Sequence, residues 1–236
     1  MEWILNISEA WRKAYPGAAV GVLALRGVSN PAGHEGLAAR KGELERKLRE
    51  RFGANGRPAI KADPIIQAYT RYYKRFKKTY HVLLQMESVA LKGQPIPDVA
   101  ALVEAMFMAE LQDGLLTAVH DLDKLAPPIR LDVAQGDESY TRINSQEQRL
   151  KRGDMYIADA EGILSSIIYG PDERTRITPE TGEALFTTYA PPGIGETAVR
   201  RHMQAILDFV KIFSPTVRVD WMEVYHATGE PGAATH

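Results

Sequence analysis

The chain has 236 residues, of which 44% are hydrophobic and 25% are charged, and its formal net charge is −1. This composition is typical of a folded globular protein, and the near-zero charge excludes steering of a nucleic acid by overall charge. The absence of cysteine excludes disulfides, thiol catalysis and thiolate zinc sites. Because no apolar run approaches the ~20 residues that cross a bilayer, and the first residues lack a basic leader, we expect a cytoplasmic protein without a membrane partner.

Apolar periodicity and turn residues predict one buried strand and several helices in the first half of the chain. Residues 16–28 form a short apolar run bounded by proline, glycine and asparagine, as buried strands do. The predicted helices cover 34–52, 64–77, 80–92 and 98–114. Asp63, Pro64 and Asp98 are residue types preferred where helices begin, and residues 53–58 predict a linker. The apolar face predicted for the last of these helices consists of Val99, Leu102, Val103, Met106 and Phe107.

The second half of the chain is rich in short apolar segments separated by glycine, aspartate and proline. The predicted strands cover 115–123, 129–134, 155–162, 163–170, 184–191 and 217–225, and a helix covers 195–213. Because helices and strands are partly segregated, this order predicts an α+β fold with a mixed or antiparallel sheet and helices packed around it. No low-complexity linker divides the chain, so we expect a single domain over 1–226 and a disordered tail over 227–236.

The segment 71–78, RYYKRFKK, contains five basic and three aromatic residues and no acid. Helical spacing places the aromatic residues on one side and the basic residues on the other. Two interpretations remain open: a solvated helix face, which this sequence pattern favours, and a surface that binds RNA phosphates. The candidate RNA-binding residues are Arg71, Lys74, Arg75, Lys77 and Lys78.

Common catalytic and nucleotide-binding motifs are absent from the sequence. Residues 191–196, PPGIGE, are similar to a glycine-rich loop but lack its lysine, so we expect a strand-to-helix turn there. His120, Asp121 and Asp123 lie close together, but neighbouring residues of a strand point to opposite faces. A half-buried histidine is therefore favoured over a metal site, and we expect neither a metal nor a cofactor.

The connection 169–186 is unusually polar for a segment between two apolar strands. A loop so dense in hydroxyls and charge, held by strands, suits the binding of a polar ligand. A solvated connection with local capping hydrogen bonds is the alternative. The candidate ligand-binding residues of this loop are Arg174, Thr175, Thr178 and Thr181.

Three stretches, 93–125, 129–138 and 153–186, together resemble the tRNA-editing domain of the beta subunit of phenylalanyl-tRNA synthetase, which also occurs as free-standing proteins. The resemblance covers about residues 70–213 and extends to the order of the predicted elements. It implies the fold of that domain and its activity, the hydrolysis of the ester that joins a wrongly attached amino acid to tRNA. In that family the pocket positions the ester and a water molecule, and the known substrate is tyrosine on phenylalanine tRNA.

The resemblance also implies roles for individual residues. Residues 170–173 correspond to the family's Gly-Gly-Glu, and Thr181 has the family's spacing from the glutamate, so Glu173 would contact the aminoacyl group. Where the family carries a strand histidine, this chain has Ala118. His120 lies two residues further along, on the same face of the strand, so we expect its imidazole to reach the pocket.

Our main hypothesis is a free-standing protein that hydrolyses mischarged aminoacyl-tRNA in trans, with tRNA and not DNA as its partner. Glu173 and His120 would orient the ester or its water, and Arg130 and Arg174 would bind the tRNA 3′ end or pair with local acids. Without a synthetase body, such a protein has to hold the tRNA itself, which favours an RNA role for the basic residues of 71–78. The alternative is a non-catalytic module of the same fold that binds an amino acid or tRNA, which the alanine at position 118 favours.

Overall fold

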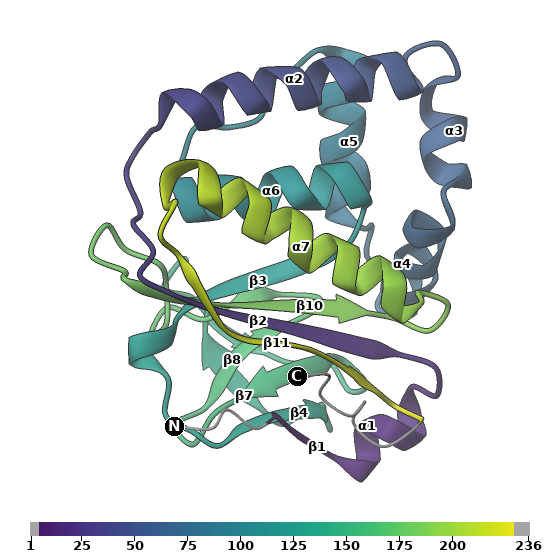
Figure 1. Ribbon diagram of the computed structural model, residues 1–236. Coiled ribbons are helices and arrows are strands. Elements are labelled where there is room, and N and C mark those ends of the chain that lie inside the picture. Colours follow the sequence, from purple (N-terminus) through teal and green to yellow (C-terminus); the bar gives the residue numbers. More distant parts are fainter. Residues whose placement is uncertain (1–4, 229–236) are drawn as a thin grey trace.

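The computed structural model describes residues 5–228 and shows a layer of helices above two sheets (Figure 1). Of the predicted tail 227–236, residues 229–236 lie outside the described residues. The helices are α1 (Glu9–Ala14), α2 (Glu35–Phe52), α3 (Gly56–Ala62), α4 (Pro64–Arg75), α5 (His81–Lys92), α6 (Ala101–Asp113) and α7 (Glu196–Phe213), with a 3₁₀ turn over Leu122–Lys124. Helices α2 to α7 lie on one side of the molecule, and α1 lies near the opposite end (Figure 1).

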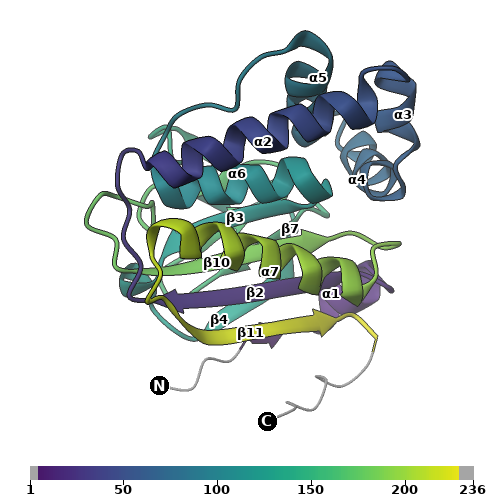
Figure 2. The same cartoon turned by 45° about the horizontal axis from the view of Figure 1, so that its top comes forward.

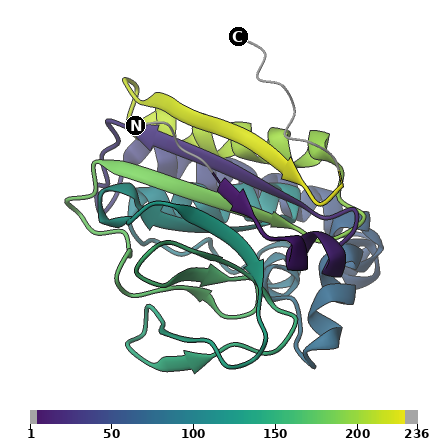
Figure 3. The same ribbon diagram turned by 90° about the horizontal axis from the view of Figure 1, so that it is seen from below.

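The sheet next to the helices is antiparallel. Its strands are β11 (Arg218–His226), β2 (Ala19–Arg26), β10 (Glu183–Ala190) and β3 (Leu116–Asp121), in that spatial order. Figure 3 shows these four strands side by side, from β11 in yellow to β3 in teal. Because β3 is the last strand of the sheet, one of its edges has no strand partner.

The second sheet is mixed. Its strands are β1 (Leu5–Ile7), β4 (Ile129–Val133), β7 (Met155–Ala158), β8 (Ile163–Ser166) and β9 (Gly170–Pro171), in that spatial order. Only the β1–β4 pair within this sheet is parallel. A separate hairpin consists of β5 (Ser139–Thr141) and β6 (Glu147–Arg149). The predicted α+β fold, with helices packed on mixed and antiparallel sheets, is confirmed.

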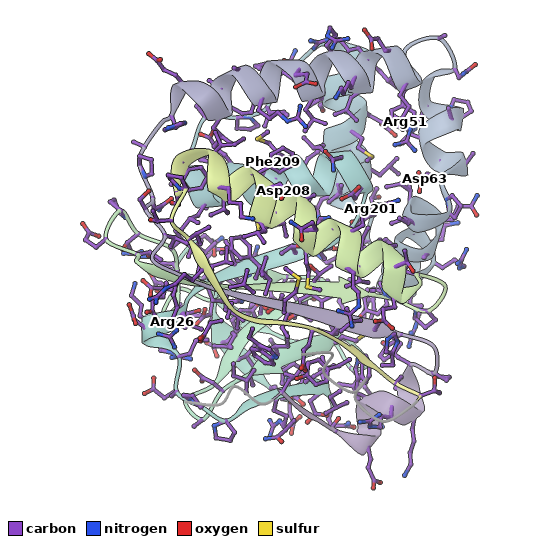
Figure 4. The ribbon with its side chains drawn as sticks, in the orientation of Figure 1. Arg26, Arg51, Asp63, Arg201, Asp208 and Phe209 are labelled. Carbon is purple, nitrogen blue, oxygen red and sulfur yellow. The ribbon has the colours of Figure 1, made fainter. Side chains whose placement is uncertain are left out.

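Helix α4 forms as its sequence predicts. The Asp63 carboxylate accepts the main-chain N–H of Ile65 at 2.9 Å, so Asp63 caps the helix that Pro64 opens. The same carboxylate forms an ion pair with Arg51 at the end of α2, with 3.0 Å between Asp63 Oδ2 and Arg51 Nη2. This ion pair connects α2 to α4 (Figure 4). The aromatic residues of 71–78 are buried and its basic residues are exposed.

Tyr69 joins α4 to the sheet through its hydroxyl group. The hydroxyl donates to the carbonyl of Tyr189 on β10 and accepts the N–H of Leu116 on β3 at 2.9 Å. It therefore bridges two strands where their ladder begins. Its ring stacks on that of Tyr80, with centroids 4.3 Å apart, so the aromatic face of α4 is a packing surface.

The prediction of a single apolar face for α6 is wrong, because the helix is buried on more than one side. Figure 2 shows α6 between α2 and the sheet, and its buried residues point in every direction around the helix axis. The helix begins after Ala100 rather than at the predicted cap Asp98, and Val99 is exposed. Because helices and strands surround α6, even Glu104 is buried, and it pairs with Lys41 of α2 at 2.8 Å.

Candidate functional site

A cavity of about 410 Å³ lies at the free edge of β3. This volume lies within the ~300–1,000 Å³ range of small-ligand pockets. Helix α6 supplies one wall through Val103, Met106 and Phe107, and Ile167 and Ile168, between β8 and β9, supply another. The cavity therefore forms where α6 and the second sheet approach the uncovered edge of the first sheet.

The main chain of β3 contributes hydrogen-bonding groups to this edge. The N–H of Thr117 donates to the Glu110 carboxylate at 2.8 Å, and the N–H of Asp121 donates to the carbonyl of Thr175 at 2.8 Å. In an antiparallel strand every second N–H points to the same edge, so the N–H of Val119, midway between them, also points outward. Val119 is also one of the residues that line the cavity, and the hydrogen bonds that residues 5–228 make outside the strand ladders include none from its N–H.

Glu110 is a buried carboxyl group in the wall of the cavity. It lies on α6 and is 1% exposed. One of its oxygens accepts the N–H of Thr117, and the other has no hydrogen-bond partner among residues 5–228. Burial raises the pKa of Glu110 from 4.5 to about 8, and the Thr117 hydrogen bond opposes this rise. Near neutral pH the group is therefore mostly a neutral carboxylic acid that can donate a hydrogen bond to a ligand.

A carboxylate, an imidazole and a hydroxyl form a chain of hydrogen bonds between α6, α7 and β3. Asp113 Oδ2 lies 3.3 Å from His202 Nδ1, and His202 Nε2 lies 2.8 Å from Thr117 Oγ1. This is the order of groups in a catalytic triad. The Thr117 hydroxyl, however, also contacts Thr188 of β10 at 3.0 Å, on the inner side of β3. We interpret the three groups as a network that fixes β3 between α6, α7 and β10.

The rim of the cavity adjoins the basic residues of 71–78. The Lys78 ammonium lies 4.9 Å from the centroid of the Tyr169 ring, and Arg142 Nε donates to the Tyr169 carbonyl at 3.0 Å. Tyr169, Arg142 and His81 all line the cavity. Lys78, at the end of the basic segment, therefore lies beside the rim of the cavity.

The five predicted RNA-binding residues are all exposed. They are Arg71, Lys74, Arg75, Lys77 and Lys78. Within residues 5–228, none of them forms an ion pair with a carboxylate. The solvent face of α2 differs, since Arg46 pairs with Glu50 there at 2.7 Å. The structure thus leaves the positive charge of 71–78 uncompensated, and its contact with RNA stays a prediction.

Ala118 and His120 lie on the same face of β3, as predicted, but in different surroundings. Ala118 lines the cavity, whereas His120 is fully buried. The His120 ring lies 2.8 Å from the Thr175 hydroxyl through Nδ1 and 3.2 Å from the Ser165 hydroxyl through Nε2. Both ring nitrogens are therefore occupied. A catalytic role for His120 stays a prediction, and its contacts describe a link between the two sheets.

Glu173 lies outside the cavity. Its carboxylate accepts the Ser145 hydroxyl at 2.6 Å, and its side chain is 34% exposed. With Arg174 it lines a separate surface groove of about 370 Å³. Arg174 makes two contacts of 2.8 Å to Asp159, and Arg130 lies 3.4 Å from Asp132, so both arginines pair with local acids.

The predicted threonines of the polar loop make local hydrogen bonds. The Thr181 hydroxyl donates to Asp121 at 2.8 Å and accepts the N–H of Thr178 at 2.9 Å. The Thr175 hydroxyl donates to Asp172. These contacts agree with the alternative interpretation of this loop, a connection held by local capping hydrogen bonds. Ligand binding by Thr175, Thr178 and Thr181 stays a prediction, and among the predicted substrate-binding residues that the structure describes, Ala118 alone lines the cavity.

Sequence reasoning missed Glu110 as a site residue. A glutamate within an apolar helix pattern was the available signal, but the pattern of α6 was interpreted as core only. Within the described part of the chain, no three histidine, aspartate or glutamate side chains converge in a way that could hold a metal ion. The helices of that part include none long and apolar enough to cross a membrane.

Residues 66–206 match the B3/4 domain, so the chain belongs to the B3/4 domain family. The fold also matches a crystal structure of an N-terminal fragment of the phenylalanyl-tRNA synthetase beta subunit from Pyrococcus horikoshii, with a TM-score of 0.50 and 13% sequence identity. The match covers 95% of this chain and 54% of that fragment, so this chain spans about half its length. Among curated protein sequences, none matches. The resemblance to the synthetase beta subunit is thereby confirmed at the level of the fold, and the family of the chain is that of the B3/4 domain.

Proposed function

We propose that this protein acts in trans on aminoacyl-tRNA and hydrolyses the ester of a mischarged species. The observation that carries the proposal is the cavity at the edge of β3, whose rim adjoins Lys78, one of a set of exposed cations that form no ion pair with a carboxylate within residues 5–228. A charged tRNA offers a polyphosphate chain and an amino acid at its end. In this proposal the basic residues bind the phosphates and the cavity binds the amino acid.

In this proposal the amino-acid side chain enters the apolar cavity and the ester stays near β3. The N–H of Val119 donates a hydrogen bond to the ester carbonyl, whose negative charge grows as water attacks. Glu110 meets a polar group of the aminoacyl moiety. Catalysis then consists of positioning and electrostatic stabilisation, with water as the nucleophile. The resemblance implies that Glu173 and His120 orient the ester or its water, and these catalytic roles remain part of the proposal.

The test is deacylation of a panel of correctly and wrongly charged tRNAs, which includes tyrosine on phenylalanine tRNA. Ala118→Leu narrows the cavity and is expected to slow hydrolysis at least tenfold. Ala160→Leu, on the exposed turn between β7 and β8, is the matched control. Glu173→Ala and His120→Gln, measured beside them, test the roles implied by resemblance. If the wild-type protein releases no amino acid from any member of the panel, the proposed activity is abandoned.

A non-catalytic module that binds an amino acid or tRNA is the second candidate. Ala118, at the position where the resembling domain has a histidine, favours it. Binding of a charged tRNA that Ala118→Leu weakens, without any hydrolysis, would establish the module in place of the deacylase.

A further inference from the structure

We propose that the segment 149–152, Arg-Leu-Lys-Arg, forms a second phosphate-binding segment and completes, with 71–78, one RNA-contact surface beside the cavity. This inference rests on the proposed function, because it takes tRNA as the partner. It adds residues that lie far from 71–78 in the sequence and that neither the motifs nor the family resemblance singled out.

The fold brings the two segments side by side. The ammonium of Lys151 donates to the carbonyl of Phe76 at 3.0 Å. The Arg75 guanidinium lies 5.0 Å from the centroid of the Tyr15 ring, and the Tyr15 hydroxyl donates to the carbonyl of Gly153. These contacts fasten the loop after β6 to the end of α4. The cations of both segments therefore lie on neighbouring parts of one surface.

Charge distinguishes this surface from an ordinary solvated face. Arg149, Lys151 and Arg152 are exposed, and within residues 5–228 none of them forms an ion pair with a carboxylate. Cations on the solvent face of α2 are paired instead, as Lys47 is with Glu43 at 2.7 Å. Arg149 shares a surface groove with Asp137 and Glu147, so the uncompensated charge of this segment lies on Lys151 and Arg152. Exposed cations without ion-pair partners repel one another, and a bound polyanion relieves that repulsion.

The surface extends to the rim of the cavity. Lys78 lies over the ring of Tyr169, and Arg142, which follows β5 in the same hairpin as the 149–152 segment, donates to the Tyr169 carbonyl. Tyr169 and Arg142 line the cavity. Lys78 thus connects the 71–78 segment to the opening through which an aminoacyl group would enter, and the 149–152 segment adjoins 71–78 through the contact of Lys151 with Phe76.

This arrangement fits the acylated end of a tRNA. The amino acid would occupy the cavity, and the phosphates that precede the terminal nucleotide would lie along the cations of 71–78 and 149–152. Each cation that neutralises a phosphate releases a counterion, so binding should weaken steeply with salt. A duplex DNA or an acidic protein offers similar charge but no acylated end for the cavity.

The test measures the affinity of wild-type protein and variants for a tRNA over a range of salt concentrations. Lys151→Gln with Arg152→Gln should reduce the slope of log K against log salt by about one unit for each lost phosphate contact. Lys74→Gln with Lys77→Gln should do the same for the first segment. The matched control is Arg46→Gln with Lys47→Gln on α2, which should keep the wild-type slope.

The single variant Arg152→Gln distinguishes a loss of charge from a loss of folding stability. The Arg152 side chain makes no hydrogen bond to any residue in 5–228, so its replacement removes charge without removing a hydrogen bond of the fold. A wild-type slope in both Arg152 variants, together with a reduced slope in the Lys74 and Lys77 variant, would overturn this inference and leave the proposed function standing. Failure of the wild-type protein to bind any tRNA would overturn both. Equal affinity for duplex DNA of similar length would reduce the surface to a general polyanion site and overturn the assignment to tRNA.

Discussion

Replacing Glu110 with glutamine should change how the stability of the protein depends on pH. The side chain of Glu110 is buried beside the cavity, and burial raises its pKa from 4.5 to about 8. The folded protein therefore holds a proton on Glu110 more tightly than the unfolded chain does. Its contribution to stability is fully present below pH 4.5, declines as the pH rises, and is lost above about pH 8.

The size of this effect follows from the difference between the two pKa values. One pKa unit corresponds to about 1.4 kcal/mol, so the rise from 4.5 to about 8 corresponds to about 5 kcal/mol between acidic and alkaline pH. A glutamine at position 110 keeps the acceptor for the N–H of Thr117 and does not titrate. The free energy of unfolding of Glu110→Gln, minus that of the wild type, should therefore increase by about 4 kcal/mol from pH 4.5 to pH 8.5, most of the full difference.

Urea denaturation of both proteins at several pH values measures this difference. The comparison between variant and wild type removes the contributions of the other titrating groups. Glu87→Gln is the matched control, because Glu87 lies on α5, pairs with Arg57 at 2.6 Å and does not line the cavity. A difference between Glu110→Gln and wild type that stays constant from pH 4.5 to pH 8.5 would refute the reasoning.

Three further substitutions test the packing around the site. Lys41→Met should lower the free energy of unfolding by about 3–5 kcal/mol in urea denaturation, because it leaves the buried Glu104 without its cation. Lys47→Met, at an exposed position of the same helix, should lower the free energy of unfolding far less. Gly21→Ala should cost about 1–3 kcal/mol, since the new methyl group would lie 2.5 Å from a side chain of α7, and an unchanged melting temperature would contradict this. Tyr69→Phe should cost about 1–3 kcal/mol, because two buried main-chain groups of β3 and β10 lose their partner, and hydrogen exchange at the start of β3 should accelerate.

Local signals in the sequence were sufficient for most elements. The cap at Asp63 and the apolar face of α4 predicted its position to within a few residues, because both depend on near neighbours in the chain. Helix α3, over Gly56–Ala62, was instead predicted as part of a linker. It contains glycine and proline, which weaken a helix in isolation, and it forms where α2 and α5 pack against it.

Long-range contacts account for the elements that sequence patterns described wrongly. The predicted strand 163–170 ends at Ser166, and Gly170–Pro171 form a separate short strand that pairs antiparallel with it. The carbonyl of Ile167 accepts the Tyr73 hydroxyl of α4 at 2.7 Å, so the chain turns towards the helix at this point. No pattern within 163–170 contains this information, because the partner lies about ninety residues earlier in the chain.

The candidate site was harder to predict than the fold for the same reason. A resemblance of segments pointed to Ala118, which lines the cavity, and its role in substrate binding stays a prediction. It also pointed to Glu173, which the structure places at the surface beside Ser145. Glu110 has no distinctive neighbours in sequence, and only the approach of α6 to β3 gives it a role. Distances between elements therefore decide which polar residues share a pocket.

The position of the cavity follows from a problem that every open sheet has. An uncovered edge strand can pair with another chain, and proteins protect such edges with helices or loops. Here α6 and the segment after β8 cover the edge of β3. Among residues 5–228, Glu110 of α6 accepts the N–H of Thr117, and the carbonyl of Thr175, in the loop after β9, accepts the N–H of Asp121. By the alternation of N–H groups along the strand, the N–H of Val119 points to the same edge between them. The cover that prevents pairing with another strand thus also forms the walls of the cavity that the proposed function assigns to the aminoacyl group.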